Sequence, residues 1–263
     1  CREVEVITCL GDSNPHEKVV STNLHPNVKL TPFKLKDRPT IRKRRFVEEG
    51  HLRKLFEVYY MEDKPVDDDS ASKICDYLDR DLSNFDLVVV CDFGHGMMVG
   101  RIIEQLQRKA QYLAVNAQAN AGNMGYNLIT KYSRADYACI DGREAHLAVH
   151  DNHSEMAEIV SKRLPKLIDC ARFAVTLGHR GCLAWDTEEG LVTIPAFSHT
   201  PVDTIGAGDT FLAVTSPLSA AGRGLKETAF IGNVAAGIQI GVVGHRQSLD
   251  ISMVKKSIVS LLK

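Results

Sequence analysis

Short apolar runs alternate with longer amphipathic stretches through the middle of the chain, and this pattern restricts the fold more than any other feature of the sequence. Apolar runs fall at 86–91, 112–116, 137–140 and 173–177, and helical patterns fall between them at 99–110, 143–149 and 154–164. Several runs are almost wholly apolar, which is typical of strands buried on both faces. The pattern predicts an α/β fold with a mostly parallel central sheet between helices.

Polar residues follow these runs where the predicted strands end. They are Asp92, Asn116, Asp141 and the turn that begins at Thr176. The carboxyl ends of parallel strands lie at one edge of a sheet, and ligands of open α/β sheets bind there. We therefore expect these residues to lie at a ligand site.

The segment 27–61 differs, because three β-like runs follow one another with no helical pattern between them. The runs lie at 27–35, 40–47 and 54–61. They predict a small antiparallel sheet that projects from the main layer, as a lid does. No repeat, low-complexity tract or long linker interrupts the chain, so we expect one domain, 1–263, with this lid as a subdomain.

Composition excludes several classes of protein. The chain has 263 residues, 32 Lys+Arg against 33 Asp+Glu and a formal net charge of −1, which argues against a nucleic-acid-binding protein. No apolar run reaches the roughly 18 residues that cross a bilayer, so we expect no membrane span. The seven cysteines are scattered without a CxxC pair, as in a cytoplasmic protein with reduced thiols.

The strongest local motif is VDTIGAGDTF, which runs from Val202 to Phe211 ahead of a predicted helix at 208–221. Glycines at a helix start let the backbone approach an anion, and free N–H groups and the positive end of the helix dipole face it. Asp209, in the first turn, is placed to take a proton from a hydroxyl that attacks a phosphoryl group. The alternative is that Asp203 and Asp209 only cap and charge-match the helix.

The whole string resembles the C-terminal signature of the ribokinase-like (PfkB) family of carbohydrate kinases, Asp-Thr-x-Gly-Ala-Gly-Asp. Further segments resemble family elements in the same order along the chain. They are Gly11-Asp12, Asp92-Phe93-Gly94-His95-Gly96, Asp141-Gly142-Arg143-Glu144, the Thr176–Gly181 turn and Asn233-Val234-Ala235-Ala236. The second of these is similar to an Asp-Tyr-x-Lys-Gly turn of the heptose-phosphate kinase branch, which serves ADP-heptose synthesis. The resemblance implies a ribokinase-like three-layer sandwich with a small β lid.

The same resemblance implies ATP-dependent phosphoryl transfer to a sugar or sugar phosphate. Asp209 would be the catalytic base, and the amides of Gly206, Ala207 and Gly208 would hold charge on the transferred group. The nucleotide would contact residues from three of these segments: Asp141, Glu144, Thr176, Gly178, Gly181 and Asn233. Asp92 would contact the acceptor.

Metal sites are also implied by the resemblance. Glu144 would organise Mg²⁺ through water, since magnesium retains much of its hydration. A monovalent cation such as K⁺ would be bound by Asp203, the Ile205 carbonyl and groups near Gly244 and Ser248.

A basic cluster, Arg42-Lys43-Arg44-Arg45, lies in the lid-like segment. Alternation along a strand puts Arg42 and Arg44 on one face and Lys43 and Arg45 on the other. One interpretation is a solvated strand edge protected by charge. The other is that Arg42 and Arg44 bind a sugar phosphate such as heptose 7-phosphate, because arginine makes bidentate contacts with phosphate.

Several positions depart from the family pattern. Asp141 replaces Asn, His95 replaces Lys, and the stretch from Asn116 to Asn120 replaces Asp-Pro-Lys. The family's first strand and Gly-Gly turn have no counterpart, so we expect an N-terminally incomplete family domain. Alternatives that stay open are a non-catalytic nucleotide-binding or regulatory remnant, and a kinase for a nucleoside or another alcohol. A homodimer and an associated nucleotidyltransferase domain are expected by resemblance only.

Overall fold

In the computed structural model, the protein is described over residues 1–48, 54–120, 122–197, 202–242 and 248–263. The strands are β1 Val4–Ser13, β2 Val28–Pro39, β3 Arg42–Val47, β4 Lys54–Tyr60, β5 Val88–Asp92, β6 Leu113–Ala117, β7 Arg134–Asp141, β8 Asp169–Thr176, β9 Cys182–Asp186 and β10 Gly190–Ile194. The helices are α1 Glu17–Thr22, α2 Asp68–Asp81, α3 Gly100–Lys109, α4 Gly142–Ala148, α5 Met156–Glu158, α6 Leu164–Leu167, α7 Ala207–Ala220, α8 Leu225–Gln239 and α9 Ile251–Leu261. A π-helical turn, Ile159–Arg163, joins α5 to α6.

Two compact units make up the chain. One comprises residues 1–82 and 95–106, and the other comprises residues 83–94 and 107–263. None of the helices in the described ranges is long and apolar enough to cross a membrane.

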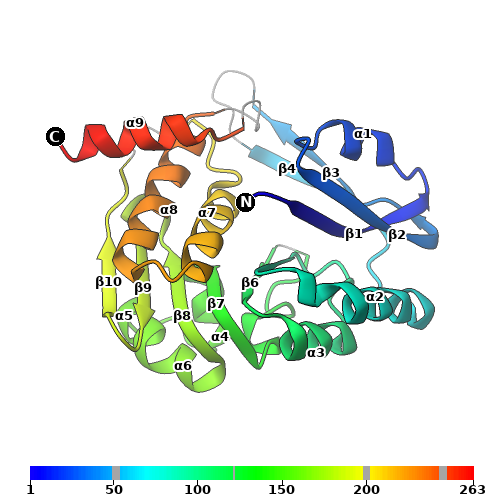
Figure 1. The fold of residues 1–263 in the computed structure, drawn as a ribbon, viewed down its shortest axis with the longest axis horizontal. Coiled ribbons are helices and arrows are strands. Elements are labelled where there is room, and N and C mark those ends of the chain that lie inside the picture. Colours follow the sequence, from blue (N-terminus) through cyan, green and yellow to red (C-terminus); the bar gives the residue numbers. More distant parts are fainter. Residues whose placement is uncertain (49–53, 121, 198–201, 243–247) are drawn as a thin grey trace. The chain divides into compact units, whose positions relative to one another are not determined.

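The larger unit is built on a six-stranded sheet in the order β10-β9-β8-β7-β6-β5 (Figure 1). Strands β5 to β8 run parallel, and β9 and β10 add two antiparallel strands at one side. The predicted, mostly parallel α/β sheet is therefore confirmed. Each expected strand of this sheet is present within a few residues of its predicted bounds.

Helices cover this sheet on both faces, which gives three layers. On one face, Tyr137 and Cys139 of β7 and Ala174 of β8 pack with Phe211 of α7 and Ala229 of α8. Their neighbours along the strands point to the opposite face, since side chains alternate, and they are equally buried. There α4 and the segment from α5 to α6 contact β7, β8 and β9. Burial on both faces explains why these strands read as continuous apolar runs.

The smaller unit contains two separate two-stranded sheets. Strands β1 and β2 pair in parallel, with Val4 opposite Val28, and the short helix α1 lies between them in the sequence. Strands β3 and β4 pair antiparallel, with Arg42 opposite Tyr60. The prediction of one antiparallel sheet over 27–61 is therefore wrong for its first run, which pairs with the N-terminal strand. Helix α1 was not predicted, because its six residues include none that is buried.

Candidate active site

The predicted catalytic motif lies at the start of helix α7. Gly206 precedes the helix with φ of 80°, a left-handed conformation that favours glycine. Asp209 lies in the first turn and is exposed. A Cβ at Gly208 would meet no heavy atom within 4 Å, so the space beside this amide is open. The first N–H groups of a helix lack partners within it and can bind an anion.

The segment before α7 is fixed to the end of α8. The N–H groups of Val202 and Asp203 both donate to the Ile240 carbonyl, at 2.9 and 3.0 Å. The Asp203 carboxylate accepts the Ile205 N–H at 3.0 Å, which closes a turn and orients the chain into Gly206. Ser248, another predicted cation ligand, is exposed, and Gly244 lies outside the described residues.

Asp141 and Glu144 form a reciprocal cap at the start of α4. The Glu144 N–H donates to Asp141 Oδ1 at 2.7 Å, and the Asp141 N–H donates to Glu144 Oε2 at 2.8 Å. The other Glu144 oxygen, Oε1, accepts the Ala119 N–H at 2.9 Å. Glu144 therefore joins the loop after β6 to the end of β7.

Burial changes the chemistry of Glu144. Glu144 is only 6% exposed. Burial raises the pKa of this carboxyl to about 7, with the carboxylates of Asp141 and, to a lesser extent, Asp209 adding to the rise. The two backbone donors oppose it. A carboxyl of this kind changes charge near neutral pH unless a cation holds it ionised.

The Thr176–Gly181 turn lies beside this cap, because Thr176 of β8 is opposite Asp141 of β7 in the parallel register. Gly181 has φ of 88°, and a Cβ there would lie 2.0 Å from the Ile194 carbonyl oxygen. Gly178 also has a positive φ, of 57°, but no heavy atom lies within 4 Å of a Cβ at this position. The turn brings its backbone close to the ends of β7 and β10.

An open cavity of about 710 Å³ adjoins the turn and the cap. Asp141, Thr176 and Gly178, which are predicted nucleotide residues, form part of its wall. Arg143, His146, His150 and Arg180 also line it. These basic and imidazole side chains were not assigned to the site from the sequence, because they come together only where α4 and the Thr176–Gly181 turn lie side by side.

Asn233, predicted beside the adenine, lies in α8 and is 8% exposed. Its side-chain amide donates to the carbonyl oxygens of Ile194 and Pro195, at 3.1 and 3.2 Å. In this arrangement Asn233 fixes the chain leaving β10.

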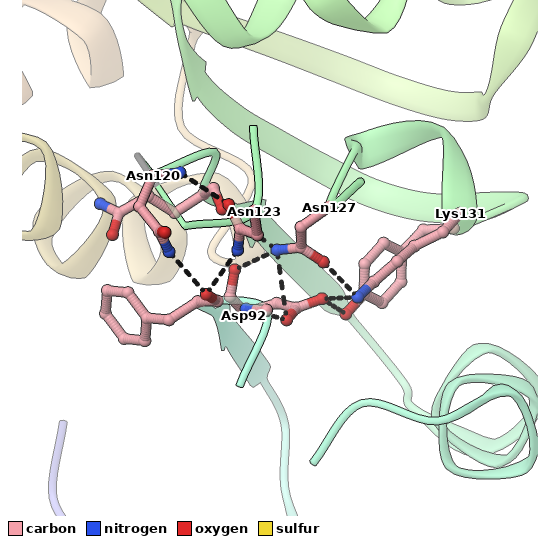
Figure 2. A network of polar contacts seen from close by, with 9 residues as sticks. Asp92, Asn120, Asn123, Asn127 and Lys131 are labelled. Carbon is pink, nitrogen blue, oxygen red and sulfur yellow. Dashed lines mark hydrogen bonds and ion pairs between the residues drawn. The ribbon is translucent and has the colours of Figure 1, made fainter. Parts of the chain in front are cut away.

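Asp92, predicted to contact the acceptor, lies at the end of β5 and is 3% exposed. Figure 2 shows its carboxylate inside a polar network. Oδ1 accepts a hydrogen bond from the Gly94 N–H at 2.9 Å. Oδ2 accepts one from the Tyr132 hydroxyl at 2.7 Å and forms an ion pair with the Lys131 amine. Both oxygens are thus bonded within the protein.

Three residues of this network, Asn123, Asn127 and Lys131, were not singled out from the sequence, and Asn120 was noted only as part of a stretch that departs from the family pattern. The side-chain amides of Asn120 and Asn123 both donate to the Phe93 carbonyl, at 3.1 and 3.0 Å. Asparagines recur at positions 116, 120, 123 and 127, and this repetition was the available signal. A loop rich in side chains that bond backbone groups is typical of a fixed, non-helical conformation.

Arg42 and Arg44 belong to the smaller unit, where they lie on one face of β3 as predicted. Their guanidinium groups lie 4.3 and 5.6 Å from the centre of the Tyr60 ring. Lys43 lies over Tyr59 and Arg45 pairs with Glu57, which confirms the alternation. Stacking on an aromatic ring orients guanidinium groups without neutralising them.

In the larger unit, the observed arrangement combines a first-turn carboxylate at Asp209, a helix start with open space beside Gly208, and a second, buried carboxylate at Glu144. Such a site can accept a proton and hold an anion at the same place. Among the described residues no group of three or more histidine, cysteine and acidic side chains is positioned to hold a metal ion directly. A hydrated cation contacting fewer protein groups fits the residues present.

A protein-family model described as pfkB family carbohydrate kinase matches residues 2–252. The chain belongs to this family. The match covers nearly the whole chain and includes Asp92, Glu144, the Thr176–Gly181 turn, Asp209 and Asn233.

Curated relatives agree with this membership. The bifunctional protein HldE of Nitratiruptor sp. is 29% identical over 211 residues, which are 79% of this chain and 43% of the relative. The bifunctional protein HldE of Aliarcobacter butzleri is 22% identical over 246 residues, which are 92% of this chain and 50% of the relative. The chain thus spans about half the length of these relatives or less.

Solved structures with the same fold include phosphofructokinase-2 from Escherichia coli in complex with potassium. It covers 99% of this chain and 83% of its own length, with a TM-score of 0.80 and 16% identity. A ribokinase from Thermotoga maritima has a TM-score of 0.72 and 18% identity over 97% of this chain and 81% of its own. The fold of this carbohydrate kinase family member is therefore ribokinase-like.

Proposed function

We propose that this protein transfers the γ-phosphoryl group of ATP to a hydroxyl group of a sugar or sugar phosphate. The observation that carries the proposal is the start of α7. There Asp209 is exposed in the first turn, beside the amides of Gly206, Ala207 and Gly208, and the space next to Gly208 is open. A binding module has no need of a carboxylate at this position.

In the proposed reaction, Asp209 accepts the proton of the acceptor hydroxyl while its oxygen attacks the γ-phosphorus. The new O–P bond forms as the bond to the β-phosphate oxygen breaks, and ADP leaves with that electron pair. The amides of Gly206, Ala207 and Gly208 donate to the phosphoryl oxygens, which carry the developing charge. Mg²⁺, held through water by Glu144, would neutralise part of the phosphate charge.

The remaining residues bind and orient the substrates. Thr176, Gly178 and Gly181 border the nucleotide phosphates and ribose, Asn233 fixes the adenine side, and Asp141 and Glu144 face the hydrated Mg²⁺. Glu144 suits this role because its buried carboxyl gains from a nearby cation that keeps it ionised. Asp203 and the Ile205 carbonyl, with Gly244 and Ser248, are proposed to bind K⁺ in the cytoplasm, where this ion is abundant.

The proposed acceptor is a sugar phosphate of the heptose 7-phosphate type, as the similarity to bifunctional HldE proteins supports. Arg42 and Arg44 are the proposed phosphate contacts, since both guanidinium groups are held by Tyr60. Asp92 is assigned a positioning role because its buried carboxylate is paired with Lys131. An associated nucleotidyltransferase domain or partner and a homodimer are further proposals, made from the resemblance to the family.

A second candidate is a non-catalytic nucleotide-binding protein, which the exposed Asp141 favours. Its carboxylate adds negative charge beside the proposed phosphate site. A third candidate is a kinase whose acceptor is a nucleoside or another alcohol.

The test measures ADP release with Mg²⁺-ATP over a panel of sugars, sugar phosphates and nucleosides. It uses this chain and one extended by its upstream genomic sequence. We expect ADP release with a sugar phosphate. Binding of ATP without ADP release from either chain and any acceptor would contradict the proposal and support the non-catalytic alternative.

A further inference from the structure

The buried carboxylate of Asp92 is paired with one lysine. Asp92 is 3% exposed, and the Lys131 amine forms an ion pair with its Oδ2. The lysine side chain is 28% exposed and comes from the turn after the asparagine-rich loop, 39 residues along the chain. A buried carboxylate without a partner is strongly destabilising, so neutralising Asp92 is one evident role of Lys131.

A second bond of Lys131 has a different consequence. Its amine also donates to Asn127 Oδ1 at 2.6 Å (Figure 2). Since a lysine amine can only donate, the Asn127 atom facing it must be the carbonyl oxygen. The opposite side of the amide, Nδ2, is thereby fixed toward the Asp92 carbonyl at 2.9 Å and the Gln118 carbonyl at 3.1 Å. Lys131 thus selects the orientation of the Asn127 amide.

The Asn127 amide holds the loop that leaves β6. Gln118 is bonded on both sides, since its N–H donates to the Asp92 carbonyl at 2.8 Å and its carbonyl accepts from Asn127. The next residue, Ala119, donates its N–H to Glu144 Oε1 at 2.9 Å. The Gln118 carbonyl and the Ala119 N–H belong to one peptide group, so two hydrogen bonds on one side and one on the other connect Lys131 and Asn127 through this peptide to Glu144.

We propose that Lys131 and Asn127 are positioning residues that fix the Glu144 carboxylate through the Gln118–Ala119 backbone. This inference rests on the proposed function, in which Glu144 faces the hydrated Mg²⁺. Lys131 contacts neither substrate nor metal in this account. It acts by holding the loop donor in place, so that Glu144 retains the rotamer in which both of its oxygens are bonded.

Two variants separate this role from simple charge neutralisation. Lys131→Met removes both lysine bonds and leaves Asp92 buried and unpaired. Asp92→Asn combined with Lys131→Met removes the unpaired charge but does not restore a donor to Asn127 Oδ1. Lys166→Met is the matched control, since Lys166 is exposed in α6 and takes no part in the site.

Three quantities are measured on each chain: the melting temperature, the amide exchange rate of Ala119 by NMR, and the Mg²⁺ concentration that half-saturates ADP release. In Lys131→Met, we expect a lower melting temperature, an Ala119 exchange rate raised about tenfold and a half-saturating Mg²⁺ concentration raised about tenfold. A tenfold change corresponds to the loss of about one such hydrogen bond. In the double variant, we expect the melting temperature to recover, while the Ala119 exchange rate and the half-saturating Mg²⁺ concentration stay raised. Lys166→Met resembles the wild type in all three.

Recovery of all three quantities in the double variant would overturn the proposal, because Lys131 would then only neutralise Asp92. An Ala119 exchange rate unchanged in Lys131→Met would overturn it as well. The exchange measurement needs no activity. If the wild type releases no ADP with any acceptor, the proposed function fails on that result, and the exchange rates still decide whether Lys131 and Asn127 position the loop.

Discussion

Glu144 and Asp141 each accept the other's backbone N–H, at 2.8 and 2.7 Å, at the point where β7 passes into α4. Ser, Thr or Asp followed three residues later by Glu is a common helix-start motif, and its ordinary effect is stability. Here the Glu144 carboxyl is also buried and bonded to the loop after β6. The same motif therefore places an ionisable group of unusual pKa at the proposed phosphoryl-transfer site.

The ionisation of Glu144 should control the affinity for magnesium. The Glu144 pKa of about 7 means that its carboxyl is mainly protonated at pH 6 and mainly ionised at pH 8. If the ionised form faces Mg²⁺, apparent Mg²⁺ affinity in the ADP-release assay should rise about tenfold over this range. Glu144→Gln has no titrating group there and should show a weaker affinity that hardly varies with pH. Equal pH dependence in both proteins would contradict this role.

Ionisation of Glu144 lowers the stability of the fold, whereas it is expected to raise the affinity for Mg²⁺. The Glu144 pKa is higher in the folded protein, about 7, than its ordinary value of 4.5, so the folded state binds the proton more strongly. The contribution of Glu144 to the free energy of unfolding is thus greatest below pH 4.5 and declines as the pH rises to about 7. Urea unfolding without Mg²⁺ at pH 5 and pH 8 should show this decline in the wild type. The pH effect should be smaller in Glu144→Gln.

Gly208→Ala separates folding from catalysis. A Cβ at this position meets no heavy atom within 4 Å, and alanine favours a helix over glycine by about 1 kcal/mol, so the melting temperature should not fall. The added methyl group points toward the start of the helix, where the phosphoryl group is proposed to bind, and should lower kcat about 100-fold. Gly100→Ala, an equally unobstructed change at the start of α3, is the control. Full activity of Gly208→Ala would contradict the proposal that the phosphoryl group binds beside Gly208.

Two glycines of one turn differ in a testable way. Gly178 and Gly181 both have positive φ, but only a Cβ at Gly181 would collide with the backbone, 2.0 Å from the Ile194 oxygen. Gly178→Ala should therefore cost about 1 kcal/mol in unfolding free energy, from backbone strain alone. Gly181→Ala should cost more than about 2 kcal/mol and also weaken ATP binding, since the turn itself must shift. Equal losses would show that the close approach to β10 has little importance.

The sequence predicted the features that depend on local pattern. The strands of the large sheet and most of its helices were found because burial on both faces produces unbroken apolar runs. The start of α7 was found because Gly206 to Asp209 combine a flexible turn with a first-turn acid. The fold class was confirmed, and the family resemblance was confirmed by the match over residues 2–252.

What the sequence did not predict depends on contacts distant along the chain. The run at 27–35 was assigned to the wrong partner, because a β-strand pattern does not say which strand it pairs with. Burial of Asn233 against β10 and the bond between Lys131 and Asn127 required knowledge of which turns meet. Asp92 was expected at a strand end and lies there, but only the structure shows that both of its oxygens are bonded within the protein.

The central claim is that Asp209 is the base that takes the proton from the acceptor hydroxyl. The most direct measurement compares ADP release and ATP binding in the wild type and in Asp209→Asn, which has nearly the same shape but cannot accept that proton. We predict that turnover falls by at least about 100-fold, the lower range for loss of a general base, while the ATP dissociation constant stays within about threefold. Turnover like that of the wild type in Asp209→Asn would contradict the account.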